Sequence, residues 1–261
     1  MVKEFVGSVY LEPIEHKYFH RETGKKYGSV TQMLQMIEHE FDANEVSANI
    51  ARQLDSDPKK DPQYHGMNQN QILDYWQYLN DMANEYGTFV HETVETYLHK
   101  NKWWFPPKHE EYGDLASEVI SAYNEFSKEI DEGICMWPER IMFSEKYNIA
   151  GTADLKIDID NEWFDIGDWK TNKRFEFYSP FGVSLKKPFD HLQQCHYSIY
   201  SLQLSIYAKM CEEETGMKCR QIWIGYWHKE KKNFTRIPIM YLKNEATKLL
   251  ELHKYQNEIA I

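Results

Sequence analysis

Residues 149–171 contain two runs of alternating apolar and polar side chains, separated by a polar turn. Such alternation is typical of strands with one buried face, so we predict a β-hairpin here. If the turn is centred on Asn161, the two strands place Asp154 directly opposite Asp168. Opposed side chains of a strand pair lie about 4.5–5.5 Å apart, so the two carboxylates belong to one site. Lys170 follows Asp168 by two residues and therefore points to the same face.

The charges of this hairpin have two interpretations. Charged side chains on a hairpin face are most often solvated, and that interpretation needs no ligand. Here, however, Gly-Thr-Ala at 151–153 and the apolar run at 164–167 flank the carboxylates, so we expect this end of the hairpin to be enclosed. Two enclosed carboxylates without a cation would repel each other at high cost. The pattern therefore favours a divalent metal ion between Asp154 and Asp168, with Lys170 beside it.

The periodicity of the remaining chain predicts helices and strands before and after this hairpin. From residue 69 to 99 the pattern is helical, with Gly87 as a point of interruption and with an apolar stripe expected in the core, formed by Ile72, Trp76, Leu79 and Ala83. The other expected elements are a β-ribbon at 8–31 that turns at 22–25, a helix through 32–37 capped by Ser29 or Thr31, a loop at 55–66, a helix at 114–131, a strand at 139–146, a helix at 190–213, strands at 220–228 and 233–239, and a helix at 244–258.

The strand at 139–146 is expected to pair with the first strand of the hairpin, and the loop between them decides what it adds to the site. A two-residue loop places position 141 opposite position 154 and brings Glu139 or Glu145 to the carboxylates. A three-residue loop turns both glutamates away. At the level of sequence both registers remain open.

The composition describes a chain that can bury one large core. Of the 261 residues 42% are apolar and 15% aromatic, so we expect a single domain, with 1–66 as an N-terminal elaboration and 67–261 as the core. We find no run of 18 apolar residues, signal peptide or transit helix, which favours a cytoplasmic protein that does not bind a membrane. The four cysteines form no C-x-x-C pair, so we expect free thiols rather than a structural zinc or iron–sulfur site; they are Cys135, Cys195, Cys211 and Cys219.

The net charge of −11 argues against a protein that coats DNA by neutralising phosphates. It does not exclude a nuclease, because the local field at a site matters more than the total charge. Basic residues gather at 171–190, directly after the hairpin, and at 229–236, between the last two strands. Lys173 and Arg174 in the first cluster are candidates for contacts with a phosphate backbone. Ordinary solvated charges explain both clusters equally well.

Three features outside the hairpin also bear on a nucleic-acid site. His91 and Glu95 are four residues apart and share a helix face, although a lone helical histidine is more often structural than a ligand. Trp103 and Trp104 are able to stack on nucleobases, but packing against the preceding helix is the simpler expectation. The third feature is a polar and aromatic stripe on the predicted helix 190–213, which either forms a packed boundary or lines a substrate groove; it consists of His196, Tyr200, Gln203 and Tyr207.

Four motifs of the chain resemble those of the PD-(D/E)XK nuclease superfamily. More narrowly, they resemble its RecB-like exonuclease branch, which includes the mitochondrial genome maintenance exonuclease and many phage-encoded exonucleases. The resemblance covers about residues 27–255, with glycine where the exonuclease group has the proline of Pro-Ser-Val-Thr. Each motif is weak alone, and their shared order makes the resemblance fairly specific. In chain order they are Gly28-Ser-Val-Thr31, Gly87-x-x-x-His91-x-x-x-Glu95, Gly151-Thr-Ala-Asp154 with Asp168-Trp-Lys170, and Gln203-x-x-x-Tyr207.

The resemblance implies an α/β fold with a restriction-endonuclease-like core, in which helices flank a mixed central sheet, together with an N-terminal β-ribbon and a helical extension. It implies Mg²⁺ or Mn²⁺ as cofactor, because hard cations prefer oxygen ligands. No iron–sulfur cluster is expected, since the cysteine spacing departs from that of the relatives that hold one. The implied roles are metal binding by His91, Asp154, Asp168 and the backbone carbonyl of Trp169, activation of water or stabilisation of charge by Lys170, substrate binding by Gln203, Tyr207, Lys173 and Arg174, and secondary roles for Glu145, Glu139 and Glu95.

The function implied is hydrolysis of DNA phosphodiester bonds from an end, with a preference for single-stranded DNA, leaving 5′-phosphate and 3′-hydroxyl groups. Such an enzyme would serve DNA replication, recombination or repair in a bacterial or phage-infected cell, alongside recombination or replication proteins. Two alternatives remain. One is a structure-specific endonuclease on the same fold, and the other is a catalytically idle nucleic-acid-binding module of a recombination complex. A purely structural interaction protein is favoured only if no metal binds.

Overall fold

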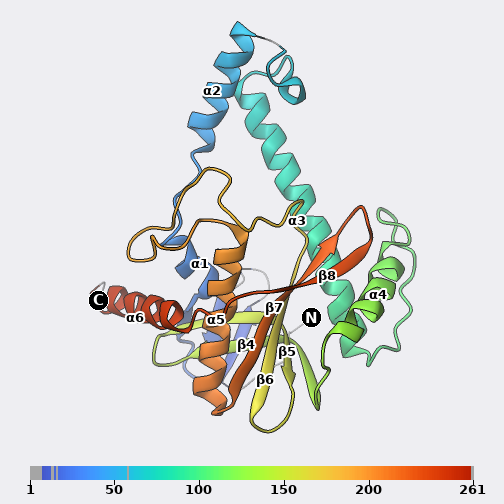
Figure 1. The fold of residues 1–261 in the computed structure, drawn as a ribbon, viewed down its shortest axis with the longest axis vertical. Coiled ribbons are helices and arrows are strands. Elements are labelled where there is room, and N and C mark those ends of the chain that lie inside the picture. The colour runs from blue at the N-terminus through green and yellow to red at the C-terminus, as the bar shows by residue number, and fades with distance from the viewer. Residues whose placement is uncertain (1–7, 13–14, 16, 58, 260–261) are drawn as a thin grey trace. The chain divides into compact units, whose positions relative to one another are not determined.

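The computed structural model describes residues 8–12, 15, 17–57 and 59–259, so the expectations for residues 1–7 and Pro58 lie outside it (Figure 1). Its contacts divide the chain into two compact units. The larger unit contains residues 1–38 and 90–261, and the smaller contains residues 39–89. The expected N-terminal elaboration, 1–66, is therefore divided between the two units.

The smaller unit contains helix α2, Ala43–Ser56, the short helix η1, Pro62–Tyr64, and the first part of α3, Gln69–His99. Helix α2 begins at a side-chain cap, because the carboxylate of Asp42 accepts the amide hydrogen of Glu45 at 2.8 Å. An acid followed three residues later by glutamate is a signal for a helix start. The apolar periodicity predicted no helix at residues 43–56, so this capping signal was the feature of the sequence that indicated one.

Helix α3 runs without a break through Gly87, where an interruption was expected. Of the predicted core stripe, Ile72 is fully buried and Trp76 packs against the same small cluster. Leu79 is 46% exposed and Ala83 is also exposed, so the stripe was predicted too long. The reason is that the core of this unit gathers around the first turns of the helix, and helical spacing alone does not reveal where a partner surface ends.

The larger unit is built on a mixed sheet, formed by eight strands of the described residues (Figure 1). The first three strands form the predicted antiparallel ribbon, whose third strand joins the start of β5 in parallel. Strands β4, β5 and β6 are antiparallel neighbours, β6 and β7 are parallel, and β7 and β8 are antiparallel. The strands are β1 Val9–Glu12, β2 Lys17–His20, β3 Lys26–Ser29, β4 Cys135–Ser144, β5 Ile149–Asp158, β6 Trp163–Lys170, β7 Lys218–His228 and β8 Asn233–Pro238.

The predicted hairpin is formed by β5 and β6, and its register is the predicted one. The last hydrogen-bonded pair before the strands separate joins Leu155 to Gly167. The next position in this register aligns Asp154 with Asp168, as the centred turn required. The hairpin prediction and its register are therefore confirmed.

The pairing of β4 with β5 differs from both registers that the sequence left open. Ile141 lies opposite Thr152, and the connection between the strands has four residues, 145–148. Position 139 would align with Asp154, but the ladder omits this pair, and Glu139 has a left-handed backbone with φ of 50°. A local irregularity of β4 therefore lies directly beside the predicted site.

Helices cover both faces of this sheet (Figure 1). On one face, α5, His196–Thr215, shares the main core with α1, Val30–Gln35, and α6, Lys243–Ile259. On the other face, α4, Leu115–Phe126, packs beside β8. The even-numbered residues of β6 face α5, since Phe164 belongs to the main core.

The odd-numbered residues of β6 face α4 and enter an aromatic cluster. The ring of Trp169 lies 5.5 Å from Phe126 and 5.6 Å from Trp223 between ring centroids. Each tryptophan covers a glycine of the neighbouring strand: a Cβ atom on Gly167 would lie 2.2 Å from Trp223, and one on Gly225 would lie 2.3 Å from Trp169. Close approach of ring to backbone requires glycine at both positions.

The remaining elements agree with the predictions within a few residues, apart from the start of α5. Ser29 occupies the cap position of α1, as one alternative proposed. Helix α5 begins at His196 rather than at residue 190, because residues 192–194 form backbone hydrogen bonds with 183–185 and close a loop.

The predicted fold class, an α/β fold with a mixed central sheet flanked by helices, is confirmed. Across the described ranges no helix combines the length and apolarity needed to cross a membrane.

Candidate active site

The candidate active site lies where β5 and β6 separate. Beyond the Leu155–Gly167 pair, the amide hydrogen of Trp169 is bound by the side chain of Asp154, at 2.7 Å from Oδ2. A carboxylate thus replaces the backbone acceptor that a continued ladder would provide. The N–H and C=O groups of one strand residue point to the same neighbour. The carbonyl of Trp169 is therefore directed into the same gap.

Helix α3 contributes His91 to this gap. Its Nδ1 atom lies 3.2 Å from Oδ2 of Asp154. Burial alone would lower the pKa of His91, but the Asp154 carboxylate outweighs burial and raises it. Burial would raise the pKa of Asp154, and the opposing effects of His91, Lys170 and the Trp169 amide hold it below its ordinary value. The site therefore favours a charged pair between helix and strand.

The second carboxylate, Asp168, is paired with Lys170. Both project from the α5 face of β6, and the ammonium group of Lys170 contacts Oδ2 of Asp168. Burial and the charge of Asp154 raise the pKa of Asp168 in spite of the ion pair. Burial would lower the pKa of Lys170, but the two carboxylates raise it. Two acids and two bases thus balance one another in the gap where β5 and β6 separate, which we call the fork.

Helix α5 covers this cluster with the predicted polar and aromatic stripe. The ring of Tyr200 lies 4.8 Å from the Nζ atom of Lys170, a cation–π distance. Its hydroxyl donates to Oδ1 of Asn172 at 2.7 Å, and its ring stacks on His196 with centroids 5.5 Å apart. Tyr200 is a site residue that the sequence interpretation counted only as part of the stripe. Its spacing of three from Gln203 was the signal that could have placed it.

Gln203 and Tyr207 also face the strands of the site. The amide of Gln203 donates to the hydroxyl of Tyr207 at 3.3 Å. The Tyr207 ring lies so close to β5 that a Cβ atom on Gly151 would lie 2.6 Å from it. Burial raises the pKa of Tyr207, and the charges of Asp168 and Asp154 add to this effect, so its hydroxyl remains a hydrogen-bond donor beside the carboxylates.

Two of the predicted glutamates, Glu145 and Glu95, lie outside this cluster. Glu145 is bonded to Tyr27, and its register position in β5 precedes Asp154 by six residues, about 20 Å of strand. Glu95 pairs with His99 on α3, at 3.6 Å.

Three further sets of predictions have different outcomes. Lys173 and Arg174 are exposed on the segment that follows β6. Trp103 is 82% exposed, so the expectation that it packs against the helix is wrong. None of the four cysteines forms a disulfide bond, and Cys135 is partly exposed whereas the other three are buried.

The donor set decides whether a metal would fit. Two carboxylates, an imidazole and a carbonyl directed into the fork are ligands suited to Mg²⁺ or Mn²⁺. In the part of the chain that the structure describes, no three His, Cys, Asp or Glu side chains already form a metal cluster. His91 and Lys170 instead neutralise one carboxylate each, at Asp154 and Asp168. The chemistry fits a divalent ion, and its binding would exchange these ion pairs for metal–oxygen bonds.

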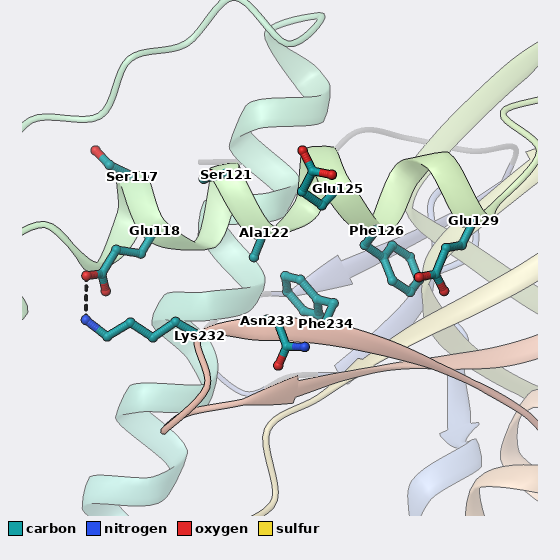
Figure 2. A pocket seen from close by; sticks show the side chains of 10 residues that line it. All are labelled: Ser117, Glu118, Ser121, Ala122, Glu125, Phe126, Glu129, Lys232, Asn233 and Phe234. Carbon is teal, nitrogen blue, oxygen red and sulfur yellow. Dashed lines mark hydrogen bonds and ion pairs between the residues drawn. The ribbon is translucent and has the colours of Figure 1, made fainter.

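A surface hollow of the larger unit lies away from this cluster. It has a volume of about 620 Å³ and lies between α4 and the start of β8 (Figure 2). Phe126 and Phe234 form its floor, and Glu118, paired with Lys232, closes one end. Both phenylalanines pack on Trp169, so the hollow is on the face of β6 opposite to the carboxylates.

No family model and no curated protein matches the chain. Among solved structures, a candidate exonuclease from Eubacterium rectale is 18% identical, with a TM-score of 0.43, and the match covers 64% of this chain and 64% of that one. The protein SSO0001 is 14% identical, with a TM-score of 0.34, over 87% of this chain and 83% of that one. At these identities and scores neither neighbour assigns a function to the chain.

Proposed function

We propose that the chain is a divalent-metal-dependent deoxyribonuclease of the PD-(D/E)XK type, most similar to the RecB-like exonucleases. The observation that supports the proposal best is the convergence of Asp154, Asp168 and Lys170 at the point where two strands separate. Enclosing three charged side chains in one fork costs folding free energy, so stability by itself does not explain them. Their arrangement is reasonable if it serves the hydrolysis of a phosphodiester.

Asp154, Asp168 and the carbonyl of Trp169 would hold the metal, with His91 as a further ligand or as the partner that positions Asp154. A divalent ion bound there supplies charge neutralisation and a more acidic bound water. Lys170 would orient or deprotonate the attacking water, or stabilise the charge that develops on the phosphate.

Helix α5 would position the phosphate. The hydroxyl of Tyr207 and the amide of Gln203 provide donors beside the carboxylates, and burial raises the pKa of Tyr207, which keeps that hydroxyl protonated. Lys173 and Arg174 follow the site on the chain and would bind the phosphates of the strand beyond it. We infer that the substrate is the end of a single DNA strand, which fits a role in replication, recombination or repair with the proteins of those processes.

A cleavage assay tests the proposal directly. Oligonucleotides labelled at the 5′ or 3′ end, single- and double-stranded, are incubated with Mg²⁺, Mn²⁺ or EDTA. We expect metal-dependent shortening from an end, with 5′-phosphate products. Circular single strands, if cut, would indicate the endonuclease alternative. Binding without cleavage under every metal condition would contradict the proposal and indicate the idle binding module.

Site variants give the matched comparison. Lys170→Met should lower the cleavage rate at least about a hundredfold. The control is Lys156→Met, because Lys156 pairs with Asp158 in the same hairpin at the same spacing of two residues, away from the fork. Full activity of Lys170→Met, or equal losses in both variants, would contradict the assigned role.

A further inference from the structure

A ladder of aromatic rings leads from the candidate active site to the surface. It begins at Tyr200, whose ring lies beside Lys170. Phe175 follows, with its ring centroid 6.0 Å from that of Tyr200, and Phe177 lies 5.0 Å beyond Phe175. Phe177 is 50% exposed. The ladder therefore connects the lysine of the fork with a ring that solvent reaches.

Beyond Phe177 the chain exposes two further rings. Tyr178 is 76% exposed and Phe181 is 85% exposed. The three rings lie within five residues of the chain, and large exposed apolar groups on a folded protein usually mark a binding surface. We call Phe177, Tyr178 and Phe181 the aromatic platform.

The platform is fixed to the body of the larger unit. The amide of Glu176 donates to Nδ1 of His196 at 3.2 Å, and its carbonyl accepts the amide of Tyr197 at 3.0 Å. The thiol of Cys195 donates to the carbonyl of Phe177 at 3.4 Å, and the Phe177 ring lies 5.7 Å from that of Tyr197. Contacts with the start of α5 thus hold the segment before any ligand binds, which lowers the entropic cost of binding.

The charge around the platform is opposite to that of the whole chain. Residues 171–190 contain four lysines and arginines and two acids, whereas the protein carries a net charge of −11. Lys173 and Arg174 are exposed on the same segment. Cations that bind a backbone and rings that stack on bases are the combination by which proteins hold unpaired nucleic acid. A duplex offers its phosphates, but its bases are already stacked on one another.

We propose that the aromatic platform binds the bases of an unpaired DNA strand as the strand passes between the fork and solvent. The inference rests on the proposed nuclease function, and it assigns the preference for single strands to Phe177 and Tyr178. Stacking accepts every base, so the platform would select unpaired DNA without selecting a sequence.

Binding in EDTA tests the platform independently of cleavage. Fluorescence anisotropy measures the affinity for a labelled thymidine strand, for an abasic strand of the same length and for a duplex. The variant Phe177→Leu with Tyr178→Leu keeps apolar side chains and removes the rings. We expect it to bind the thymidine strand about tenfold to a hundredfold more weakly, and the abasic strand and duplex as the wild type does.

Two controls separate stacking from general damage. The exchange Phe177→Tyr with Tyr178→Phe retains both rings and should bind like the wild type. Tyr255→Leu removes a tyrosine that is 62% exposed on α6, and it should have no effect. The proposal that the platform stacks on bases would be overturned if the double leucine variant bound the thymidine strand with wild-type affinity, or if it lost as much affinity for the abasic strand.

The same protein samples distinguish this inference from the nuclease proposal. If the wild type cleaves with Mn²⁺ while the double leucine variant keeps full affinity, the proposed DNA binding by the platform is wrong and the proposed nuclease activity is supported. If the wild type shows ring-dependent binding but cleaves nothing, the proposed hydrolysis is wrong and DNA binding by the platform is supported. A ring-dependent loss that is equal for single strand and duplex would place the rings in a different contact and contradict the assignment.

Discussion

Removing the positive charge of Lys170 should expose how the fork is balanced in the absence of metal. Asp168 is only 2% exposed and lies beside Asp154, so Lys170→Met leaves a buried carboxylate without its counter-ion. Breaking a buried pair costs about 3–5 kcal/mol. Because the Lys170 side chain is 18% exposed, we expect the lower end of that range. For a chain of this size, 3 kcal/mol corresponds to a fall in Tm of roughly 6–12 °C.

A divalent ion should reverse this loss, because it supplies the missing positive charge. Binding at a hundred times Kd stabilises by about 2.7 kcal/mol. Denaturant unfolding is measured in EDTA and in Mn²⁺ for the wild type, Lys170→Met, and Lys170→Met with Asp168→Asn. The double variant should recover most of the stability in EDTA and gain little from Mn²⁺, since it lacks both charges.

The matched control is again Lys156→Met. Lys156 is 4% exposed, and its partner Asp158 also accepts the indole hydrogen of Trp137 at 2.6 Å. We expect a comparable loss of stability in EDTA and no recovery with Mn²⁺. The reasoning would be refuted if Lys170→Met unfolds at the wild-type midpoint in EDTA, or if Mn²⁺ stabilises both lysine variants equally.

Three further predictions concern backbone fit and thiol chemistry. Gly28→Pro should be less stable than Gly28→Ala by about 1 kcal/mol, because the Gly28 amide donates to the carbonyl of Asn148 at 3.0 Å; equal unfolding midpoints would contradict this. Gly151→Ala should cost about 1–3 kcal/mol, since its Cβ atom would lie 2.6 Å from the Tyr207 ring, and adding Tyr207→Ala should cost less than the sum of the two changes; additive losses would show that the contact is unimportant. Burial raises the pKa of Cys211 to about 11, so iodoacetamide at pH 8 should modify it only after unfolding, as mass spectrometry would show; rapid alkylation of the native protein would refute the burial.

The site was predictable because it depends on a local rule. A tight hairpin fixes its register through the turn, and the alternation of side chains then places each residue. Asp154, Asp168 and Lys170 follow from that rule without knowledge of the rest of the fold.

The environment of these residues came from the tertiary structure. Their neutralisation by His91 depends on where α3 packs, and the ring of Tyr200 depends on the position of α5. Helical spacing assigned both side chains to a face but did not say what that face contacts. The glutamates illustrate the same limit, because the position of Glu139 and Glu145 depended on a loop whose length the pattern did not define.

The sequence by itself determined the order of the elements, the hairpin and its register, because these depend on neighbours within a few residues. The tertiary structure decided where the core of α3 ends, which faces of β6 meet α4 and α5, and that the strands separate beside Asp154. It also placed the rings of Phe175 and Phe177, in the loop after β6, in a row with the ring of Tyr200 on α5. These features depend on contacts between segments that are distant in the chain. A local pattern of polar and apolar residues does not show which distant segment a residue will contact.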